Sequence, residues 1–223
     1  MVELQTLYAN RFSADDLAWK QTVWRILCER VFQAYIPAGA TVVDIGAGSC
    51  EFINAIKATR RIAVDLNPAL PAFVAPGVEA HNGNADDLTF LPPSSVDVVF
   101  SSNFLEHLPT KDAVLDVLRA SRWVLRPGGL AILLGPNARI IPGAYWDYFD
   151  HHVPLTERSI AEALGVCGFE VVRSEARFLP YTVKSRLPRS PLLVRLFLTL
   201  HPLTSRLVGG QFLVVATTKS VKV

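Results

Sequence analysis

The sequence predicts an α/β fold, with a doubly wound sheet that carries helices on both faces. Strand-like apolar runs alternate with segments in which apolar residues recur at helical spacing, as is typical of this class. The fourth run, Ser95–Phe100, is apolar almost throughout, as expected of a strand covered on both faces. We expect seven strands, at 41–45, 61–65, 78–81, 95–100, 130–134, 169–172 and 211–216.

The stretch between the first strand and the next helix indicates a ligand site. Asp44 stands near the end of the strand, Gly46 and Gly48 follow, and helical spacing of apolar residues begins at Phe52. Glycines let the backbone approach a ligand, and the free N–H groups of a helix start attract an anionic part of it. The second strand ends in Asp65, a position that usually holds a nucleotide ribose. The pattern therefore predicts a nucleoside-containing ligand.

Position 51 discriminates between two classes of nucleoside ligand. The dinucleotide fingerprint requires a third glycine there, and this chain has Glu51. A carboxylate close to the helix start would repel a pyrophosphate, whereas it is tolerable beside a cationic ligand. An NAD-dependent oxidoreductase is therefore disfavoured and is kept as the alternative enzyme.

The segment Asp44-Ile-Gly46-Ala-Gly48-Ser-Cys50 resembles motif I of the class I S-adenosylmethionine-dependent methyltransferases. Later segments resemble the same family, over roughly residues 40–175: Gly83–Phe90, Ser101–Pro109, Leu125–Gly129 before an apolar strand, and Gly168–Val171. The likeness is to a small bacterial type with a methyltransferase-11/23-like core, often associated with glycan or secondary-metabolite modification. It implies a Rossmann-like sheet of seven strands, mostly parallel with an antiparallel last strand. It also implies S-adenosyl-L-methionine as the cofactor.

The resemblance implies which residues bind this cofactor. The glycine loop would pass under the methionine part, and the acid of the second strand would take the ribose hydroxyls. On the adenine side an amide can still bond the base edge, because it offers both a donor and an acceptor. Where the family often has a third glycine, this chain has Cys50, and a small residue in right-handed geometry could substitute. The expected cofactor-binding residues are Asp44, Gly46, Ala47, Gly48, Asp65, Leu66, Asn84, Ala85, Asp86 (if the register shifts) and Asn103.

The loop after the fourth strand carries a candidate proton acceptor. In open α/β sheets the ligand lies beyond the carboxyl ends of the strands, so this loop is expected beside the transferable methyl group. His107 could take a proton from an acceptor, and Glu106 could orient either His107 or the substrate. A packing or capping role is the alternative for this histidine.

The densest aromatic stretch of the chain, residues 145–156, is a candidate acceptor pocket. Aromatic rings with interleaved polar groups suit a substrate site, and we expect Tyr145, Trp146 and Phe149 to contact the substrate together with Glu106. Asp150 could raise the basicity of a neighbouring histidine through its opposite charge. The candidate catalytic residues are His107, His151 and His152, with aromatic packing as the alternative reading of this stretch.

No metal site or disulfide framework is expected. Adjacent residues of a strand point apart, so His151 and His152 would not share a metal, and a third ligand is not evident. The three cysteines are widely spaced, which fits a reduced, cytoplasmic compartment. The N-terminus lacks a basic-then-apolar signal pattern, and no uncharged apolar run reaches about 18 residues. Neither secretion nor a spanning helix is expected.

The flanks of the core have their own patterns within one expected domain, 1–223. Residues 1–40 form an expected helical extension, with a helix at 13–36 capped by Ser13, which packs on the sheet or covers the cofactor. The core is 41–175, an insertion occupies 176–210, and the final strand is 211–218. The insertion holds a helix between prolines, from Leu192 to Leu200, that is apolar on most of its circumference. Such a helix is buried, forms a dimer, or rests on a membrane surface, so 191–208 is the candidate segment.

The charge distribution bears on the choice of partner. The net charge is +2, yet residues 173–223 hold nine lysines and arginines against one acid. A basic region suits an anionic substrate, a membrane or nucleic acid, or is a solvated surface. Nucleic acid is not expected, because the Pro-Pro-aromatic signature of amino-methylating enzymes is replaced by Ser102–Leu105. The expected activity is methyl transfer to an O, N or C acceptor on a small molecule, glycan or lipid-linked intermediate. The non-enzyme alternative is a cofactor-binding scaffold with a basic C-terminal docking region.

Overall fold

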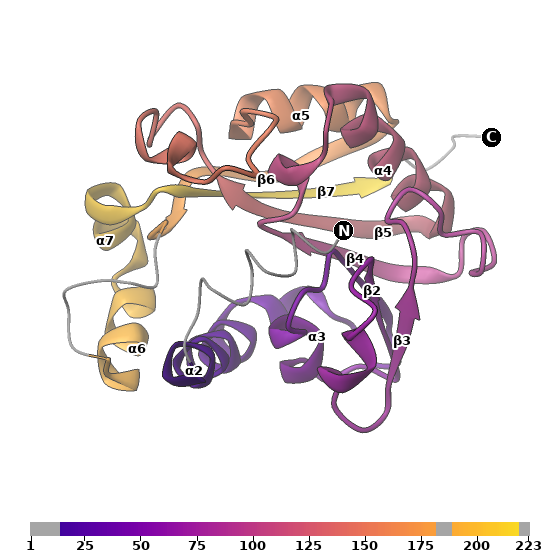
Figure 1. The fold of residues 1–223 in the computed structure, drawn as a ribbon, viewed down its shortest axis with the longest axis horizontal. Coiled ribbons are helices and arrows are strands. Elements are labelled where there is room, and N and C mark those ends of the chain that lie inside the picture. The colour runs from indigo at the N-terminus through magenta and orange to yellow at the C-terminus, as the bar shows by residue number, and fades with distance from the viewer. Residues whose placement is uncertain (1–13, 182–188, 219–223) are drawn as a thin grey trace.

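The computed structural model describes residues 14–181 and 189–218, and it shows a seven-stranded sheet with helices on both faces (Figure 1). The strand order is β3-β2-β1-β4-β5-β7-β6. β7 pairs antiparallel with both β5 and β6, and the other neighbouring pairs are parallel. The predicted α/β fold with an antiparallel last strand is confirmed. The strands are β1 (Thr41–Ile45), β2 (Arg60–Asp65), β3 (Val78–Asn82), β4 (Val96–Ser102), β5 (Leu125–Pro136), β6 (Phe169–Leu179) and β7 (Gln211–Thr218).

The helices divide between the two faces of the sheet (Figure 1). Side chains alternate along β1, so that Val43 and Ile45 join a buried cluster with α4 and α5, whereas Val42 joins a cluster with α2 and α3. Both faces are therefore covered, which explains why the central strands are apolar throughout. The helices are α2 (Ala14–Arg30), α3 (Glu51–Ala55), α4 (Lys111–Val124), α5 (Glu157–Val166), α6 (Pro191–Thr199) and α7 (His201–Val208), with short 3-10 turns η1 (Phe32–Tyr35), η2 (Leu70–Ala72), η3 (Leu105–His107) and η4 (Ala144–Asp147).

Stacked aromatic rings hold α3, and with it the glycine loop, against the sheet. The rings of Phe52 in α3 and Phe100 in β4 are stacked with centroids 3.6 Å apart, and Phe32 meets Phe100 edge-on at 5.2 Å. All three side chains are buried. Aromatic pairs of this kind stabilise by about 0.5–1.5 kcal/mol beyond their burial. The short helix after the glycine loop thus has a fixed position despite its five residues.

The first helix is shorter than the sequence predicted. α2 ends at Arg30, Val31 leaves the helical region with φ −126°, and a 3-10 turn continues to Tyr35. Pro37 disfavours helical geometry in the residue before it, which contributes to this early end. Ser13, the expected cap, lies outside the described residues.

Two strand boundaries also differ from the prediction. The Leu125–Gly129 segment was expected to be a turn before the fifth strand, but β5 already begins at Leu125, which pairs with Val96. The pairing then shifts, and Gly128 takes φ +77° within this irregularity. β6 continues to Leu179, where it still pairs with Gln211, so the predicted insertion at 176–210 begins with paired strand.

None of the helices in the described part of the chain has the length and apolar character needed to cross a bilayer.

Candidate functional site

The glycine loop sits where the strand order reverses, between β1 and its neighbours β2 and β4. The backbone N–H groups of Gly46 and Ala47 donate to the Val64 carbonyl at 2.9 and 3.1 Å. The N–H of Gly48 donates to Asp65 Oδ2 at 2.8 Å, and Asp65 Oδ1 accepts from the N–H of Asn67 at 2.8 Å. The loop after β1 and the carboxylate at the end of β2 are therefore joined, as their spacing in the sequence predicted.

Two glycines of this loop, Gly46 and Gly48, both have positive φ but differ in how closely other atoms pack against them. Gly46 has φ +66°, and a Cβ on it would collide with the ring of Phe104 from the loop after β4. Gly48 has φ +53°, and a Cβ there would meet nothing within 4 Å. The space above Gly48 is therefore open to a ligand, while Gly46 is fixed by packing. The packing of Phe104 against Gly46 could not be predicted from the sequence pattern.

Cys50 adopts the left-handed conformation, with φ +62° and ψ +25°. The right-handed geometry expected for a small residue is therefore wrong, because the loop keeps the conformation that a glycine would take. Burial, with the charges of Asp44, Glu51 and Asp65 adding to its effect, raises the pKa of the Cys50 thiol to about 12. The thiol stays neutral and is not a nucleophile near neutral pH.

Three carboxyl groups surround the glycine loop. Asp44 is buried, and burial raises its pKa well above the usual range, with the charges of Glu51 and Asp65 adding to the effect. Glu51 is also buried and forms an ion pair of 3.0 Å with Lys20 of α2. The field at the loop is accordingly negative, which favours a positively charged ligand and disfavours a pyrophosphate.

The remaining expected cofactor residues follow the ends of neighbouring strands. Leu66 follows β2, Asn84 to Asp86 lie just beyond β3, and Asn103 follows β4 with φ +50°. All except Ala85 are exposed. The side chain of Asn82 donates to the Asp65 carbonyl at 3.0 Å, which ties the end of β3 to that of β2. Since parallel strands end at a common edge, these residues border the same side of the sheet as the glycine loop.

A second polar cluster joins η3 to the aromatic segment. The carbonyl of Glu106 accepts from the backbone N–H groups of His152 and Val153 at 2.9 and 3.2 Å. The rings of His107 and His151 meet at 5.0 Å, and Glu106, His107 and His151 each bring one potential ligand atom within 4.8 Å of the others. In the sequence analysis, His151 was weighed together with its neighbour His152. In the structure the ring of His151 instead lies next to that of His107, and Glu106 is the third group of the cluster. This arrangement can share protons, and its donor set could also hold a divalent cation.

Backbone carbonyls fix the orientation of both imidazoles, of which His151 is buried and His107 is partly buried. His107 Nδ1 lies 2.9 Å from the Asp150 carbonyl, and His151 Nδ1 lies 2.8 Å from the Tyr145 carbonyl. A carbonyl only accepts, so each Nδ1 carries the hydrogen, and the neutral ring has its lone pair at Nε2. The Asp150 carboxylate lies 3.2 Å from His107 Nδ1, so its charge favours the protonated form of His107. The sequence had suggested this effect for the adjacent His151 or His152.

The Glu106 carboxyl group has an unusual environment for an acid. Its side chain is 2% exposed. Burial, with the charge of Asp150 adding to its effect, raises its pKa to about 8. Glu106 therefore keeps its proton near neutral pH and can donate a hydrogen bond.

The three expected aromatic contacts occupy different environments. Tyr145 is fully buried, and its hydroxyl donates to the Val153 carbonyl, so it supports the loop and presents no surface to a substrate. Trp146 and Phe149 are exposed by 57% and 88%. His152 is also exposed, while His151 is buried, so these neighbours do point apart. Trp146, Phe149 and His152 are therefore the accessible residues among the candidates predicted in this segment.

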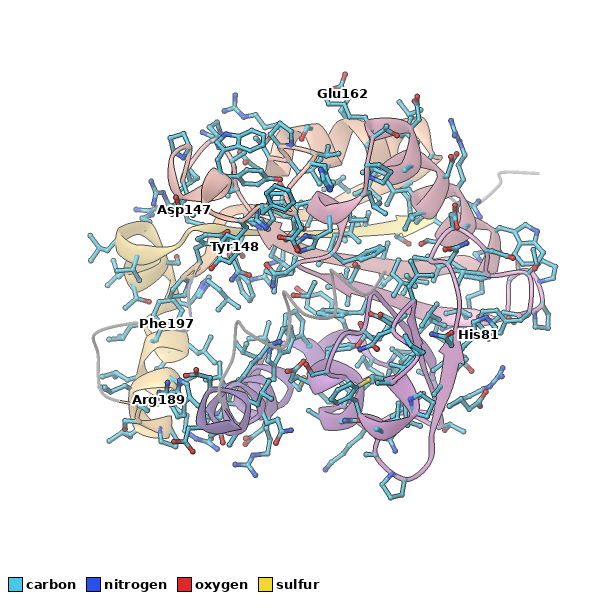
Figure 2. All side chains as sticks on the ribbon, viewed as in Figure 1. His81, Asp147, Tyr148, Glu162, Arg189 and Phe197 are labelled. Atoms are coloured by element: carbon cyan, nitrogen blue, oxygen red, sulfur yellow. The ribbon has the colours of Figure 1, made fainter. Side chains whose placement is uncertain are left out.

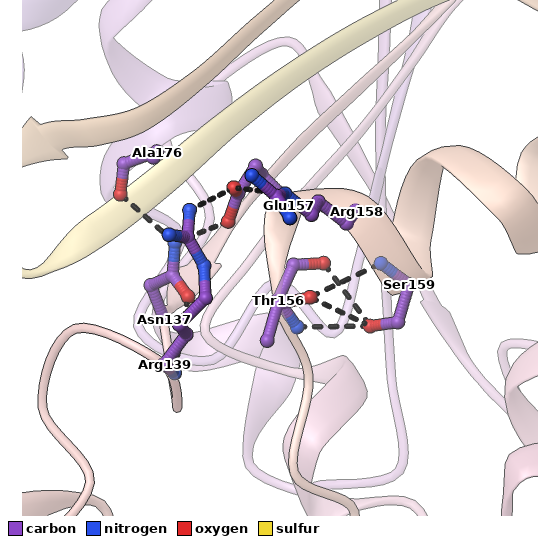
Figure 3. A network of polar contacts seen from close by, with 7 residues as sticks. All are labelled: Asn137, Arg139, Thr156, Glu157, Arg158, Ser159 and Ala176. Atoms are coloured by element: carbon purple, nitrogen blue, oxygen red, sulfur yellow. Dashed lines mark hydrogen bonds and ion pairs between the residues drawn. The ribbon is translucent and has the colours of Figure 1, made fainter.

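A polar network closes the base of this segment (Figure 3). The buried side chain of Asn137 donates to Glu157 Oε2 at 2.6 Å and to the Ala176 carbonyl at 3.0 Å, and Arg139 pairs with Glu157. Burial alone would raise the pKa of Glu157, but the bonds from Asn137 and Arg139 lower it below the usual range. Thr156 and Ser159 cap α5 reciprocally. Residues 137–156, named the acceptor loop below, thus form a closed loop whose anchors the sequence did not reveal.

Known proteins share this architecture. Residues 43–133 match the model of the methyltransferase domain family. This segment holds the glycine loop, Asp65, Glu106 and His107. Over these residues the chain carries a methyltransferase domain of the class I S-adenosylmethionine-dependent type. Its cofactor is S-adenosylmethionine, and the carboxyl-rich loop suits the positive charge of that molecule.

Solved structures agree with this methyltransferase in fold. A SAM-dependent methyltransferase from Archaeoglobus fulgidus is 20% identical, with a TM-score of 0.67 over 89% of this chain and 94% of its own. The methyltransferase of a complex with the Haloferax volcanii Trm112 activator is 17% identical, with a TM-score of 0.67 over 93% and 95%. A SAM-dependent methyltransferase from Mesorhizobium loti is 19% identical, with a TM-score of 0.59 over 82% and 94%. No curated protein matches the sequence.

The left-handed backbone at Cys50 predicts an order of stability between two substitutions. Cys50→Gly and Cys50→Ala both remove the thiol, but only alanine retains a Cβ at positive φ. We expect the glycine variant to be more stable by about 1 kcal/mol. Urea unfolding of the two variants measures the difference, and an alanine variant of equal or higher stability would contradict the assigned conformation.

The buried Glu106 carboxyl predicts a pH dependence of folding. Its pKa is about 8 in the folded protein, and about 4.3 is expected in the unfolded chain. Between these values the folded state holds the extra proton, so the Glu106 contribution to stability falls as the pH rises from about 4.3 to 8. Glu106→Gln removes this contribution, and its unfolding free energy should decline less over that window. Urea titrations at several pH values test this, with exposed Glu162→Gln as the matched control; equal slopes in wild type and Glu106→Gln would refute it.

Proposed function

We propose that this methyltransferase transfers a methyl group to an oxygen, nitrogen or carbon atom of a small-molecule, glycan or lipid-linked acceptor held against the acceptor loop. The observation that carries the proposal is the placement of two groups at one edge of the sheet. The glycine loop follows β1, and Glu106 and His107, with His151 of the acceptor loop against them, follow the adjacent strand β4. The free cysteines fit our proposal of a reducing, cytoplasmic compartment.

The residues proposed to hold the cofactor offer backbone groups, carboxyl groups and an amide to its different parts. The loop Gly46–Gly48 offers its backbone and open space above Gly48, and the Asp65 carboxylate supplies negative charge. Asp44 adjoins the loop with a carboxyl group whose raised pKa favours the protonated form. Asp65 is already oriented by two backbone N–H donors and would accept the ribose hydroxyls. Asn84 and Asp86 would bind the adenine edge, flanked by Leu66, Ala85 and Asn103. When bound, S-adenosylmethionine supplies an electrophilic methyl group on a positively charged sulfur.

His107 is the proposed proton acceptor. Its Nδ1 hydrogen is held by the Asp150 carbonyl, which leaves the Nε2 lone pair to receive a proton from the acceptor. The Asp150 carboxylate, 3.2 Å from Nδ1, would stabilise the resulting imidazolium. Protonated Glu106 and buried His151 would position this ring. Holding the acceptor contributes about 7–11 kcal/mol of the barrier, and proton removal about 10²–10⁴-fold in rate.

The accessible aromatic side chains are the proposed substrate contacts. Trp146 and Phe149 have exposed rings on the acceptor loop, whose base is fixed by Asn137 and Glu157. They could cover an acceptor and exclude water from the reacting atoms. Buried Tyr145 would act through the loop that it supports.

Cofactor binding gives the first test. We expect calorimetry to show binding of S-adenosylhomocysteine and none of NAD. Asp65→Asn keeps the side-chain shape but loses an ionised acceptor, so affinity should fall at least about tenfold, since hydrogen bonds to charged groups contribute about 1.5–3 kcal/mol. Exposed Asp112→Asn is the matched control, and equal affinity in both variants would contradict the ribose contact.

Proton transfer gives the second test. Labelled S-adenosylmethionine and a metabolite screen identify an accepted substrate. With it, His107→Ala should lower kcat by about 10²–10⁴-fold, because the proton acceptor is lost. Exposed His152→Ala is expected to remain near wild type. If His107→Ala, His151→Ala and His152→Ala all retain wild-type turnover, the cluster does not handle the proton.

A further inference from the structure

We propose that α6 and α7, together with the exposed rings of the acceptor loop, dock this enzyme on the surface of an anionic lipid membrane. This docking is independent of which atom receives the methyl group. With this docking, the enzyme would work at a membrane surface and would not depend on a freely diffusing acceptor.

The outward face of α6 and α7 is apolar and uncovered. α6 has no buried residue, and its Leu192, Leu196 and Leu200 follow one another at four-residue spacing. Leu203 and Leu207 continue the stripe on α7, with 66% and 82% of their surfaces exposed. Single exposed leucines are ordinary, but a continuous row along two consecutive helices marks an interaction surface.

The opposite face of α6 is firmly attached, so the exposed row is not a displaced part of the core. Phe197 and Leu198 pack against the cluster beneath the sheet. Arg195 pairs with Glu29 of α2 at 3.1 Å, and Arg189 pairs with Asp16 of the same helix. Figure 2 labels Phe197 on α6 and Arg189 just before that helix. The His201 ring bonds the Phe178 carbonyl at 2.8 Å. The helices have a fixed inner face and an apolar outer face, which is the amphipathic arrangement of a surface-bound helix.

The acceptor loop extends this surface. The backbone N–H of Asn137, at the start of the loop, donates to the Gly210 carbonyl just after α7 at 2.9 Å. The Tyr148 ring meets that of Tyr181, with centroids 5.8 Å apart, and Figure 1 shows the loop and α7 at one edge of the molecule. The loop that carries exposed Trp146 and Phe149 is therefore next to α7. Aromatic rings of this kind favour the interface between lipid and water.

The charges favour anionic lipid over a second copy of the chain. Residues 189–208 include Arg189, Arg195 and Arg206 and no acid. Arg206 is exposed on α7, and no carboxylate of the described residues lies within ion-pairing distance of it. Arg189 and Arg195 are already paired with acids of α2, so Arg206 is the cation that bears on the choice of partner. A two-fold contact through this face would bring the two copies of Arg206 toward each other, whereas anionic headgroups complement this residue. Exposed Asp147, on the acceptor loop, is the acid at the margin of the surface.

Docking through this surface would bring the acceptor loop to the level of the headgroups. The methyl acceptor would then be a lipid-linked or headgroup-bearing molecule. This consequence rests on the proposed function, whereas the docking itself does not.

Vesicle flotation tests the docking directly. We expect the full chain to float with vesicles of phosphatidylcholine and phosphatidylglycerol at low salt, and to bind pure phosphatidylcholine weakly. Raising the salt should weaken binding through screening. Leu203→Ser/Leu207→Ser should lower the affinity at least about tenfold, because burial of each leucine is lost. Arg206→Glu should lower it further on anionic vesicles alone.

The controls separate this proposal from its competitors. Val166→Ser changes an exposed valine of α5, away from the surface, and should float like wild type. Failure to float with either vesicle, or flotation unchanged by Leu203→Ser/Leu207→Ser, would overturn the docking. A dimer in solution that the same double variant dissociates would assign the face to a second copy. S-adenosylhomocysteine binding should be unchanged in the double variant, so failure here is distinct from failure of the Asp65 test.

Discussion

The hydrogen bond from the Gly48 amide to the Asp65 carboxylate is the contact on which the site depends. It joins the loop after β1 to the end of β2 and sets the direction of the carboxylate that we propose to bind the ribose. The aromatic stack of Phe52 and Phe100 holds the helix after that loop, so the backbone has little freedom to drift. A charged acceptor fixed by backbone donors is already oriented before a ligand arrives, and affinity is then not lost to ordering it.

The second half of the site is held by contacts between distant parts of the chain. The acceptor loop is closed at its base by Asn137 and Glu157, and its far end bonds the Glu106 carbonyl. These two attachments place His151 and Asp150 against His107. One rigid arrangement thus sets the tautomer of an imidazole and keeps a neighbouring carboxyl protonated, which allows one acid and one base to coexist near neutral pH.

Helices α6 and α7 present an apolar surface that is separate from the proposed cofactor site. Ion pairs and Phe197 fix α6 to the body of the protein, while its leucines stay outside. Because β6 continues to Leu179 and pairs with Gln211, the helices leave and rejoin the sheet at one point. That point is next to the base of the acceptor loop, which places the apolar surface and the proposed substrate contacts on one side.

The sequence by itself indicated a doubly wound α/β sheet, the approximate positions of its strands, the glycine loop and Asp65, because these follow from local periodicity, turn chemistry and short spacings. Tertiary structure decided the left-handed Cys50, which packing imposes against local preference, and the contact of Phe104 with Gly46. It also decided that His107 joins His151 and that Tyr145 is buried. Such pairings join segments about forty residues apart, and no local pattern specifies which side chains meet when two loops close on each other.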